Sequence, residues 1–192
     1  KQRRWEVNKI TQYLNQHLVG SVYDKTSILD AYSTDRSIIR IKPRFVAIPE
    51  NTNDVRKLLR FSNQLNKRNY NFPVAVRGSG LDKTGADLTT GMVISTEKLT
   101  KIQEIDPKEK LVRVQAGVTL EQLNSALALY NLTIPVDSNP KETIGGLIAG
   151  CSVDDYAGKY GGIYNFIDRA EFILPSGDCV QTEKMGKHTL KR

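Results

Sequence analysis

Apolar residues recur at helical spacing in three segments, each of which predicts an amphipathic helix. The first segment ends at Gly20, and its expected buried face contains Val7, Ile10, Tyr13, Leu14 and Leu18. The second follows the capping residues of 49–53, and its face contains Val55, Leu58, Leu59 and Leu65. The third begins at Thr119, where a capping-box pattern with Gln122 precedes the apolar residues Leu120, Leu123, Leu127 and Tyr130.

Short apolar runs between turn residues predict the strands. The runs 44–48 and 73–76 flank the second helix, so they are expected to form a βαβ unit with a parallel strand pair and a right-handed crossover. Ligands of such sheets lie beyond the carboxyl ends of the strands. The segment between Gly20 and 44–48 is expected to be irregular. Further strands are expected at 92–96, at 102–105 and 111–115 as a hairpin, and at 169–174 with a partner that ends at Thr182.

Composition is that of an ordinary globular protein, because 39% of the 192 residues are hydrophobic and 26% are charged. No run approaches the roughly 18 consecutive apolar residues of a membrane span. The N-terminal sequence is basic but lacks the apolar stretch of a signal peptide. Two cysteines, Cys151 and Cys179, are expected to be reduced thiols. These features predict a cytoplasmic protein without a transmembrane segment or a metal site.

The net charge of +7 does not by itself indicate a nucleic-acid partner. The basic residues are scattered and often stand beside acidic ones, as in Asp106-Pro107-Lys108-Glu109-Lys110. No strip of aromatic and basic residues has the character of a base-stacking surface. A nucleic-acid partner is therefore not expected, whereas a small ligand that carries phosphate would use the same charge.

A loop rich in glycine and small polar residues follows the predicted strand of 73–76, with the sequence Arg77-Gly78-Ser79-Gly80-Leu81-Asp82-Lys83-Thr84-Gly85. Glycines allow close approach and positive φ, so that several N–H groups can face one anion such as a pyrophosphate. Two familiar phosphate motifs do not fit. Walker A spacing from Gly80 to Gly85 lacks the following Lys and Ser or Thr, and Lys83 stands where a Rossmann fingerprint has its third glycine.

A second stretch of small residues runs through Thr143-Ile144-Gly145-Gly146-Leu147-Ile148-Ala149-Gly150-Cys151-Ser152. Each glycine costs about 1 kcal/mol relative to alanine in a helix, so a helix here is unfavourable on propensity alone. Close packing or a bound ligand would explain why glycines stand here at this cost. The sequence Tyr160-Gly161-Gly162 then precedes the last predicted strands. An elongated dinucleotide needs a second surface of this kind for its other half.

Several short motifs follow one another in order: Arg77-Gly78-x-Gly80, Ile105-Asp106, Gln115-Ala116-Gly117-Val118, Leu123-Asn124, Ile134-Pro135-x-Asp137-Ser138, Thr143-Ile144-Gly145-Gly146, Lys159-Tyr160-Gly161 and Leu174-Pro175-x-Gly177. Their order and spacing resemble the FAD-binding domain of the p-cresol methylhydroxylase and vanillyl-alcohol oxidase superfamily (PCMH type). The branch that contains glycolate oxidase and D-lactate dehydrogenase is the most similar. The resemblance covers about residues 43–182, which is most of the chain.

The resemblance implies an α+β fold with FAD between two α/β lobes, one with a small parallel sheet and one with a mixed or antiparallel sheet. The N-terminal lobe is expected at 1–97 and contains the 77–85 loop. The second lobe is expected at 98–192 and is expected to be truncated. Relatives add a cap domain that holds the substrate and usually supplies the general base or metal ligands. This domain is expected to be absent here, so the chain alone is expected to be inactive and to need a longer protein or a partner chain.

The resemblance also implies which residues hold FAD. The backbone of the 77–85 loop is expected around the pyrophosphate, and the second small-residue stretch near the flavin and ribityl chain. The expected cofactor-binding residues are Arg77, Gly78, Ser79, Gly80, Leu81, Asp82, Pro135, Thr143, Gly145, Gly146, Gly150, Ser152, Tyr160, Gly161 and Ile167. The catalytic residues are unknown, since Asp154 and Asp155 are adjacent carboxylates in a polar loop, where solvation is the commoner role.

Departures from the family pattern bear on the cofactor. Relatives commonly have Gly-Thr-Ser where this chain has Leu81-Asp82-Lys83, so the loop is expected to differ in shape. Asp82 is an awkward neighbour for a pyrophosphate, and Lys83 offsets its charge. Branches with covalent flavin carry a histidine in this loop, whereas the two histidines of this chain, His17 and His188, lie elsewhere. FAD is therefore expected to bind non-covalently.

Three functions remain open on the sequence. The leading one is a flavin-dependent dehydrogenase or oxidase of a small 2-hydroxy acid such as lactate or glycolate. The second is a non-catalytic FAD-binding module, and the third is a basic nucleic-acid-binding domain. A reductase of the cell-wall precursor pathway shares the FAD fold, but the context of Lys159-Tyr160-Gly161 and the closing strands fit it less well.

Overall fold

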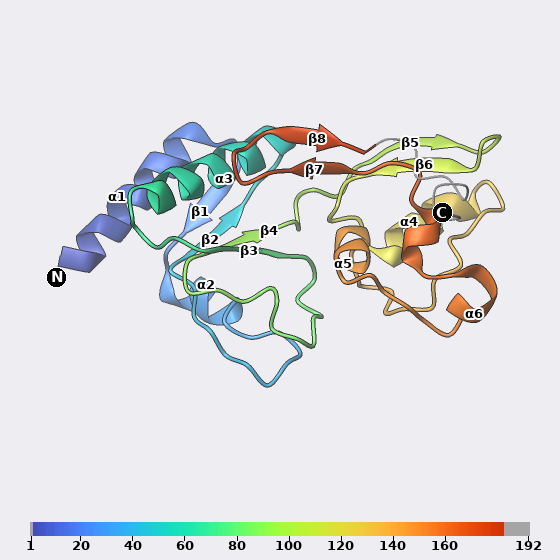
Figure 1. Ribbon diagram of the computed structural model, residues 1–192, viewed down its shortest axis with the longest axis horizontal. Coiled ribbons are helices and arrows are strands. Elements are labelled where there is room, and N and C mark those ends of the chain that lie inside the picture. The colour runs from blue at the N-terminus through green and yellow to red at the C-terminus, as the bar shows by residue number, and fades with distance from the viewer. Residues whose placement is uncertain (1, 183–192) are drawn as a thin grey trace. The chain divides into compact units, whose positions relative to one another are not determined.

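The computed structural model describes residues 2–182, and their side chains from Val7 onward (Figure 1). The chain divides into two compact units. Unit 1 contains the chain up to Lys98 together with 173–179, and unit 2 contains 99–172 together with the segment that begins at Val180. Helices combine with parallel and antiparallel strands, which confirms the expected α+β class.

Unit 1 is built on a four-stranded sheet in the order β1-β2-β4-β3. Its strands are β1 (Ser21–Tyr23), β2 (Phe45–Ile48), β3 (Val74–Arg77) and β4 (Met92–Ser95). β4 pairs in parallel with both β2 and β3, and β1 pairs antiparallel with β2. All of β4 is buried, whereas β3 includes an exposed position. The most fully buried strand is therefore an inner one, and β3 forms an edge.

The strands on either side of the second helix are parallel, as expected, but they are not neighbours in the sheet. β2 and β3 are parallel and are joined by α3 (Thr52–Lys67), but β4 lies between them. The reason is burial: Met92, Val93 and Ile94 are almost fully buried, and only an inner position removes both their backbone and their side chains from water.

Two elements of unit 1 lie where the sequence predicts irregular structure. They are β1 and the short helix α2 (Thr26–Ala31). β1 has three residues and α2 has six, so neither is long enough to show a hydrophobic period. β1 owes its extended form to pairing with β2, which is a tertiary interaction.

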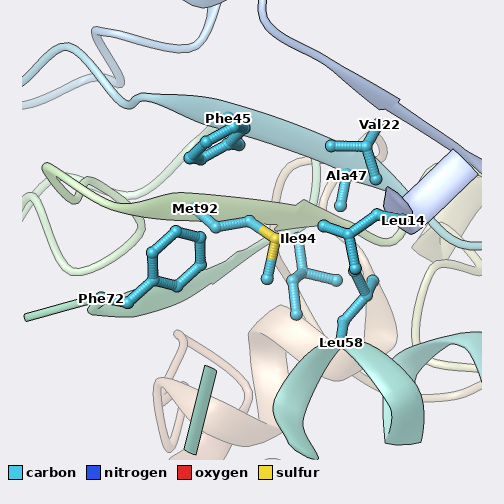
Figure 2. Close-up of a cluster of buried hydrophobic side chains, with 8 residues drawn as sticks. All are labelled: Leu14, Val22, Phe45, Ala47, Leu58, Phe72, Met92 and Ile94. Atoms are coloured by element: carbon cyan, nitrogen blue, oxygen red, sulfur yellow. The ribbon is translucent and has the colours of Figure 1, made fainter. Parts of the chain in front are cut away.

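The core of unit 1 lies between the sheet and two helices, α1 (Gln2–His17) and α3 (Figure 2). Leu14 of α1 and Leu58 of α3 pack against side chains of the sheet and of Phe72. Each such side chain stabilises the fold by about 1.5–3 kcal/mol relative to exposure. The buried cluster consists of Leu14, Val22, Phe45, Ala47, Leu58, Phe72, Met92 and Ile94.

A buried carboxylate joins the end of α1 to the start of α3. Asp54 is fully buried, and its side chain accepts hydrogen bonds from the backbone N–H groups of Val19 at 3.1 Å, Gly20 at 2.8 Å and Glu50 at 3.2 Å. The side chain of Asn51 caps α3 by accepting from the Asp54 N–H. Asp54 therefore serves three backbone donors that would otherwise lack a partner.

The turn between β7 (Glu171–Ile173) and β8 (Cys179–Gln181) docks on α3. Arg56 Nε donates to the carbonyl oxygen of Gly177 at 2.8 Å, and Arg60 Nε donates to that of Ser176 at 3.1 Å. A Cβ atom at Gly177 would lie 2.3 Å from Cγ of Arg60, so a side chain does not fit there. The closing strands expected from the sequence are confirmed.

Unit 2 contains the predicted hairpin of β5 (Ile102–Asp106) and β6 (Leu111–Val114), and the predicted helix α4 (Leu120–Ala128). The capping box is confirmed, since the N–H of Gln122 donates to Thr119 Oγ1 at 3.2 Å and the N–H of Thr119 donates to Gln122 Oε1 at 3.0 Å. Tyr130 lies beyond the helix and is exposed, unlike the rest of the predicted apolar face.

The second small-residue stretch forms a helix in spite of its glycines. This helix, α5 (Ile144–Ala149), contributes Ile144 and Leu147 to the core of unit 2. Two further short helices follow, α6 (Ala157–Tyr160) and the 3-10 helix η1 (Ile163–Phe166). No helix in the described part of the chain is long and apolar enough to span a membrane.

We expect Asp54→Ala to lower the free energy of unfolding by about 3 kcal/mol, because it leaves one buried and two partly buried N–H groups without their acceptor. Urea denaturation measures the change. Asp24→Ala is the matched control, since Asp24 accepts one side-chain hydrogen bond, from Thr11 Oγ1 at 2.9 Å, and its loss should cost less than about 1 kcal/mol. Equal losses for the two variants would contradict the role assigned to Asp54.

Candidate functional site

The 77–85 loop leaves the carboxyl end of β3, the edge where the sequence predicts a ligand. Its backbone turns at Gly80, where φ is 68°. The amide N–H groups of Gly78, Gly80, Leu81 and Asp82 have no acceptor among the described residues. Unbonded amides in a glycine-rich turn are the donors with which proteins bind phosphate groups.

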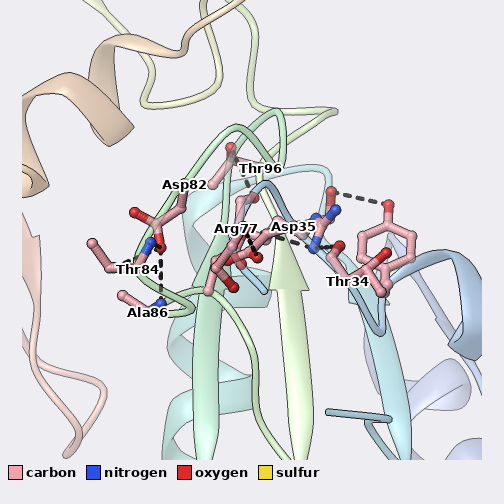
Figure 3. Close-up of polar contacts among 11 residues, drawn as sticks. Thr34, Asp35, Arg77, Asp82, Thr84, Ala86 and Thr96 are labelled. Carbon is pink, nitrogen blue, oxygen red and sulfur yellow. Dashed lines mark hydrogen bonds and ion pairs between the residues drawn. The ribbon is translucent and has the colours of Figure 1, made fainter. Parts of the chain in front are cut away.

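Asp82 turns its carboxylate back into the loop (Figure 3). Its Oδ2 accepts from the Thr84 N–H at 3.0 Å, the Thr84 hydroxyl at 2.7 Å and the Ala86 N–H at 2.9 Å. The hydrogen bond from the Thr84 side chain is the main cause that lowers the pKa of Asp82. Internal donors therefore balance the charge that makes Asp82 an awkward neighbour for a pyrophosphate.

Arg77 directs its guanidinium toward the protein, and its side chain is only 12% exposed. One terminal nitrogen, Nη1, donates to the carbonyl oxygen of Thr34 at 2.8 Å and lies 3.6 Å from Oδ2 of Asp87. The guanidinium carbon lies 5.2 Å from the centre of the Tyr32 ring, in cation–π contact. The side chain of Arg77 is thus engaged within unit 1.

Three carboxylates gather beside this guanidinium. One oxygen atom each from Asp35, Asp82 and Asp87 lie within 4.8 Å of one another. Oδ2 of Asp35 and Oδ1 of Asp87 are buried without a hydrogen-bond partner among the described residues. Burial raises the pKa of Asp87 to about 6, against the opposing effect of Arg77. The Arg77 guanidinium supplies positive charge beside this cluster.

Sequence reasoning missed this cluster. Asp87 follows the loop by two residues, and its position after a glycine-rich turn was the one available signal. Asp35 and Tyr32 lie in the segment that the sequence predicts to be irregular, so nothing in the pattern connects them with the loop. Their approach depends on α2 and on the sheet, which are tertiary features.

In unit 2, close packing explains why residue 145 is a glycine. Its N–H donates to the carbonyl oxygen of Ala116 at 2.9 Å, and a Cβ atom at Gly145 would lie 2.7 Å from the Cβ of Ala116. Thr143 caps α5 by accepting from the N–H of Gly146 at 3.2 Å. Of the two reasons considered for the glycines, packing accounts for Gly145, whereas Gly150 has more space.

The segment after α5 carries several exposed aromatic rings. Tyr160 is 42% exposed, and Lys159 Nζ lies 4.7 Å from the centre of its ring. Gly161 follows with φ at 82°. The Ser152 carbonyl oxygen accepts from the Ile163 N–H at 3.2 Å, which ties the end of the small-residue stretch to η1, and Ile167 ends that helix.

Asp154 has a structural role rather than that of a free acid or base. Its Oδ2 accepts from the N–H of Asp137 at 3.0 Å, and its Oδ1 accepts from the N–H of Tyr156 at 2.8 Å. These bonds connect the segment after Pro135 with the start of α6. Of the residues expected in the cofactor site, Arg77 to Asp82 lie in unit 1, and those from Pro135 to Ile167 lie in unit 2.

Comparison with known proteins gives a family match. A family model described as an FAD binding domain matches residues 43–183. D-lactate dehydrogenase of Archaeoglobus fulgidus is 33% identical over 170 residues, which cover 84% of this chain and 36% of that protein. D-2-hydroxyglutarate dehydrogenase of Haemophilus influenzae is 25% identical, over 87% of this chain and 16% of that protein. The chain thus spans about a third or less of the length of these relatives.

Solved structures share the fold. The crystal structure of 6-hydroxy-D-nicotine oxidase from Arthrobacter nicotinovorans superposes with a TM-score of 0.75 and 23% sequence identity. The match covers 86% of this chain and 36% of the oxidase. Alkyldihydroxyacetonephosphate synthase superposes with a TM-score of 0.74 at 18% identity, over 88% of this chain and 33% of that one.

We expect Asp87→Asn to change the pH dependence of stability. Because the pKa of Asp87 is raised to about 6 from an ordinary 3.8, the folded chain keeps a proton that the unfolded chain releases in this window. The contribution of Asp87 to stability therefore falls as the pH rises from about 4 to about 6 and stays low above it. Relative to the unmodified chain, the variant should gain unfolding free energy across this window, as measured by urea denaturation.

Asp178→Asn is the control for this experiment. A hydrogen bond from Ser176 lowers the pKa of Asp178, so its titration lies below the window. Its stability difference from the unmodified chain should be constant between about pH 4 and 6.5. A constant difference for Asp87→Asn as well would contradict the raised pKa.

We expect Gly145→Ala to destabilise unit 2 by about 2 kcal/mol, because the added methyl group overlaps Ala116. Gly158→Ala is the matched control: Gly158 lies in α6, and nothing lies within 4 Å of an added Cβ there. That substitution should be neutral or stabilising by up to about 1 kcal/mol. Thermal unfolding of both variants tests the pair, and an unchanged melting temperature for Gly145→Ala would contradict the packing argument.

Proposed function

We propose that this chain, which belongs to the family of FAD binding domains, is the FAD-holding part of a flavin-dependent oxidoreductase of small 2-hydroxy acids. FAD, when bound, supplies the hydride acceptor of such a reaction, and the protein supplies binding and orientation. The observation that carries the proposal is the 77–85 loop, whose unbonded amides follow a parallel strand within the matched range.

In this proposal the pyrophosphate is bound by backbone N–H groups from Gly78 to Asp82, including Ser79 and Leu81. The loop fits that group because four of its amides lack an internal acceptor, and because Asp82 directs its charge to Thr84 and Ala86. The loop contains no histidine, so we propose non-covalent binding.

The flavin and ribityl chain are assigned in this proposal to unit 2. The residues are Pro135, Thr143, Gly145, Gly146, Gly150, Ser152, Tyr160, Gly161 and Ile167. The support lies in the small side chains of α5 and in the exposed ring of Tyr160, which offers an aromatic face to a planar ligand. Gly145 would act indirectly, since it is needed to seat α5 against Ala116.

The substrate class is proposed from the relatives, which are named as dehydrogenases of D-lactate and D-2-hydroxyglutarate. We propose that a further domain or a partner chain supplies the substrate site, because the chain spans about a third or less of these proteins. A small-molecule substrate, a cytoplasmic location and the lack of a nucleic-acid partner belong to the same proposal.

The visible absorption spectrum with and without added FAD tests the cofactor part. We expect a flavin band that remains with the chain on gel filtration and passes a filter after denaturation, since the bond is non-covalent. Leu81→Asp should weaken FAD binding at least about tenfold, because it adds a charge at the pyrophosphate. Leu111→Asp, on the exposed end of the β5–β6 hairpin, should leave it unchanged.

The outcomes separate the alternatives. Absence of a flavin band and of thermal stabilisation by excess FAD would contradict the proposal. Flavin binding without oxidation of D-lactate or glycolate, in a longer protein that includes the remaining domains, is the result expected of a non-catalytic FAD-binding module. Equal effects of the two leucine substitutions would remove the 77–85 loop from the site.

A further inference from the structure

We infer that Arg77 is a positioning residue, whose guanidinium holds the 77–85 loop in its anion-binding form from the protein side and does not itself contact the phosphates. The inference rests on the proposed FAD function and deepens it. Arginine beside a phosphate loop would ordinarily be assigned a direct ion pair with the ligand. The contacts of this arginine favour the indirect role.

The side chain of Arg77 is directed toward unit 1. The planar guanidinium is engaged by the Thr34 carbonyl oxygen at 2.8 Å, by Asp87 at 3.6 Å and by the face of the Tyr32 ring. Tyr32 is itself held, since its hydroxyl donates to Oε2 of Glu97 at 2.8 Å. These contacts hold the plane of the guanidinium against unit 1, and a planar guanidinium can make them together whereas an ammonium cannot.

The guanidinium of Arg77 also contacts Gly80. A Cβ atom built on Gly80 would lie 2.2 Å from Nη2 of Arg77, so the guanidinium packs directly against the loop backbone at its positive φ position. The main chain of Arg77 is also fixed, because its carbonyl oxygen accepts from the N–H of Thr96 at 2.9 Å. Arg77 thus connects both the end of β3 and the turn of the loop to unit 1.

Arg77 also supplies positive charge beside a group of carboxylates. A pyrophosphate bound to this loop adds negative charge near Asp35, Asp82 and Asp87, which already face one another. The neighbouring charges that act most strongly on Asp87 among the described residues are those of Arg77, Asp35 and Asp82, and Arg77 is the cation of these three. Without Arg77, these carboxylates would repel the bound pyrophosphate.

The test compares FAD affinity, measured by flavin fluorescence at pH 8, for Arg77→Met, Arg77→Lys and Arg44→Met. Arg44 is a matched control in the same unit: it donates to the carbonyl oxygens of Asn71 at 2.8 Å and Thr90 at 3.3 Å, and it lies over the Phe72 ring. We expect Arg77→Met to weaken binding about 30-fold and Arg44→Met by less than about threefold. Melting temperatures without FAD report folding separately.

Arg77→Lys distinguishes positioning from direct contact. Lysine keeps the charge but cannot serve Thr34, Asp87 and the Tyr32 ring with one planar group. Because the charge still offsets the carboxylates while the planar contacts are lost, we expect an affinity between those of the unmodified chain and Arg77→Met, and at least about threefold below that of the unmodified chain. An affinity close to that of the unmodified chain would show that charge alone suffices and would overturn the inference. This variant also serves if Arg77→Met fails to fold.

A pH profile supplies the readout that a purely structural role would not change. In Arg77→Met, protonation of Asp87 removes the repulsion, so FAD affinity should recover about tenfold between pH 8 and pH 5.5, more than in the unmodified chain. In the double variant that carries both Arg77→Met and Asp87→Asn, the higher FAD affinity should already be present at pH 8. Parallel profiles in all variants would overturn the inference.

Failure of the inference and failure of the proposed function give different results. If the unmodified chain binds FAD and Arg77→Met binds it equally well, the positioning role is wrong while the FAD function stands. If the unmodified chain binds no FAD at any pH, the proposed function is wrong and the inference with it.

Discussion

The burial of β4 is the constraint on which the rest of unit 1 depends. Its residues are inaccessible to water, so the strand needs a neighbour on each side, and β2 and β3 pair with it in parallel. That arrangement brings the carboxyl ends of β3 and β4 together, where the Thr96 N–H meets the Arg77 carbonyl oxygen. The 77–85 loop therefore starts from a fixed point, and the edge position of β3 leaves room for the loop and for the residues after α2 that face it.

Local patterns in the sequence predicted the elements whose stability is local. The capping box at Thr119, the helices with strong apolar periodicity and the β5–β6 hairpin all formed where expected. The short elements β1 and α2 and the insertion of β4 between β2 and β3 were not predicted, because pairing across the sheet decides them. The family was predictable from the order of motifs and is confirmed by the match over 43–183. The carboxylate cluster was not, since Asp35 and Asp87 are far apart in the sequence and approach only after the sheet has formed.

The two glycine-rich segments serve different physical needs. In the 77–85 loop, Gly80 adopts a positive φ, and because it has no side chain the Arg77 guanidinium can pack against its backbone. In α5, Gly145 has ordinary helical geometry and is required because Ala116 leaves no room for a methyl group. Composition alone therefore showed that both segments are constrained, but it could not show which constraint acts on which glycine. The distinction decides whether substitution of a given glycine should mainly weaken ligand binding or mainly destabilise the fold.

The docking of the β7–β8 turn on α3 has a consequence for the order in which the protein is made. Gly177 and Ser176 supply backbone acceptors to Arg56 and Arg60, so unit 1 incorporates residues that follow nearly all of unit 2 in the sequence. During synthesis the ribosome releases the N-terminal part first, and domains usually fold in that order. Here the first unit cannot be completed until the second has been translated, so the nascent chain must carry a partly assembled N-terminal unit until its late-arriving turn emerges.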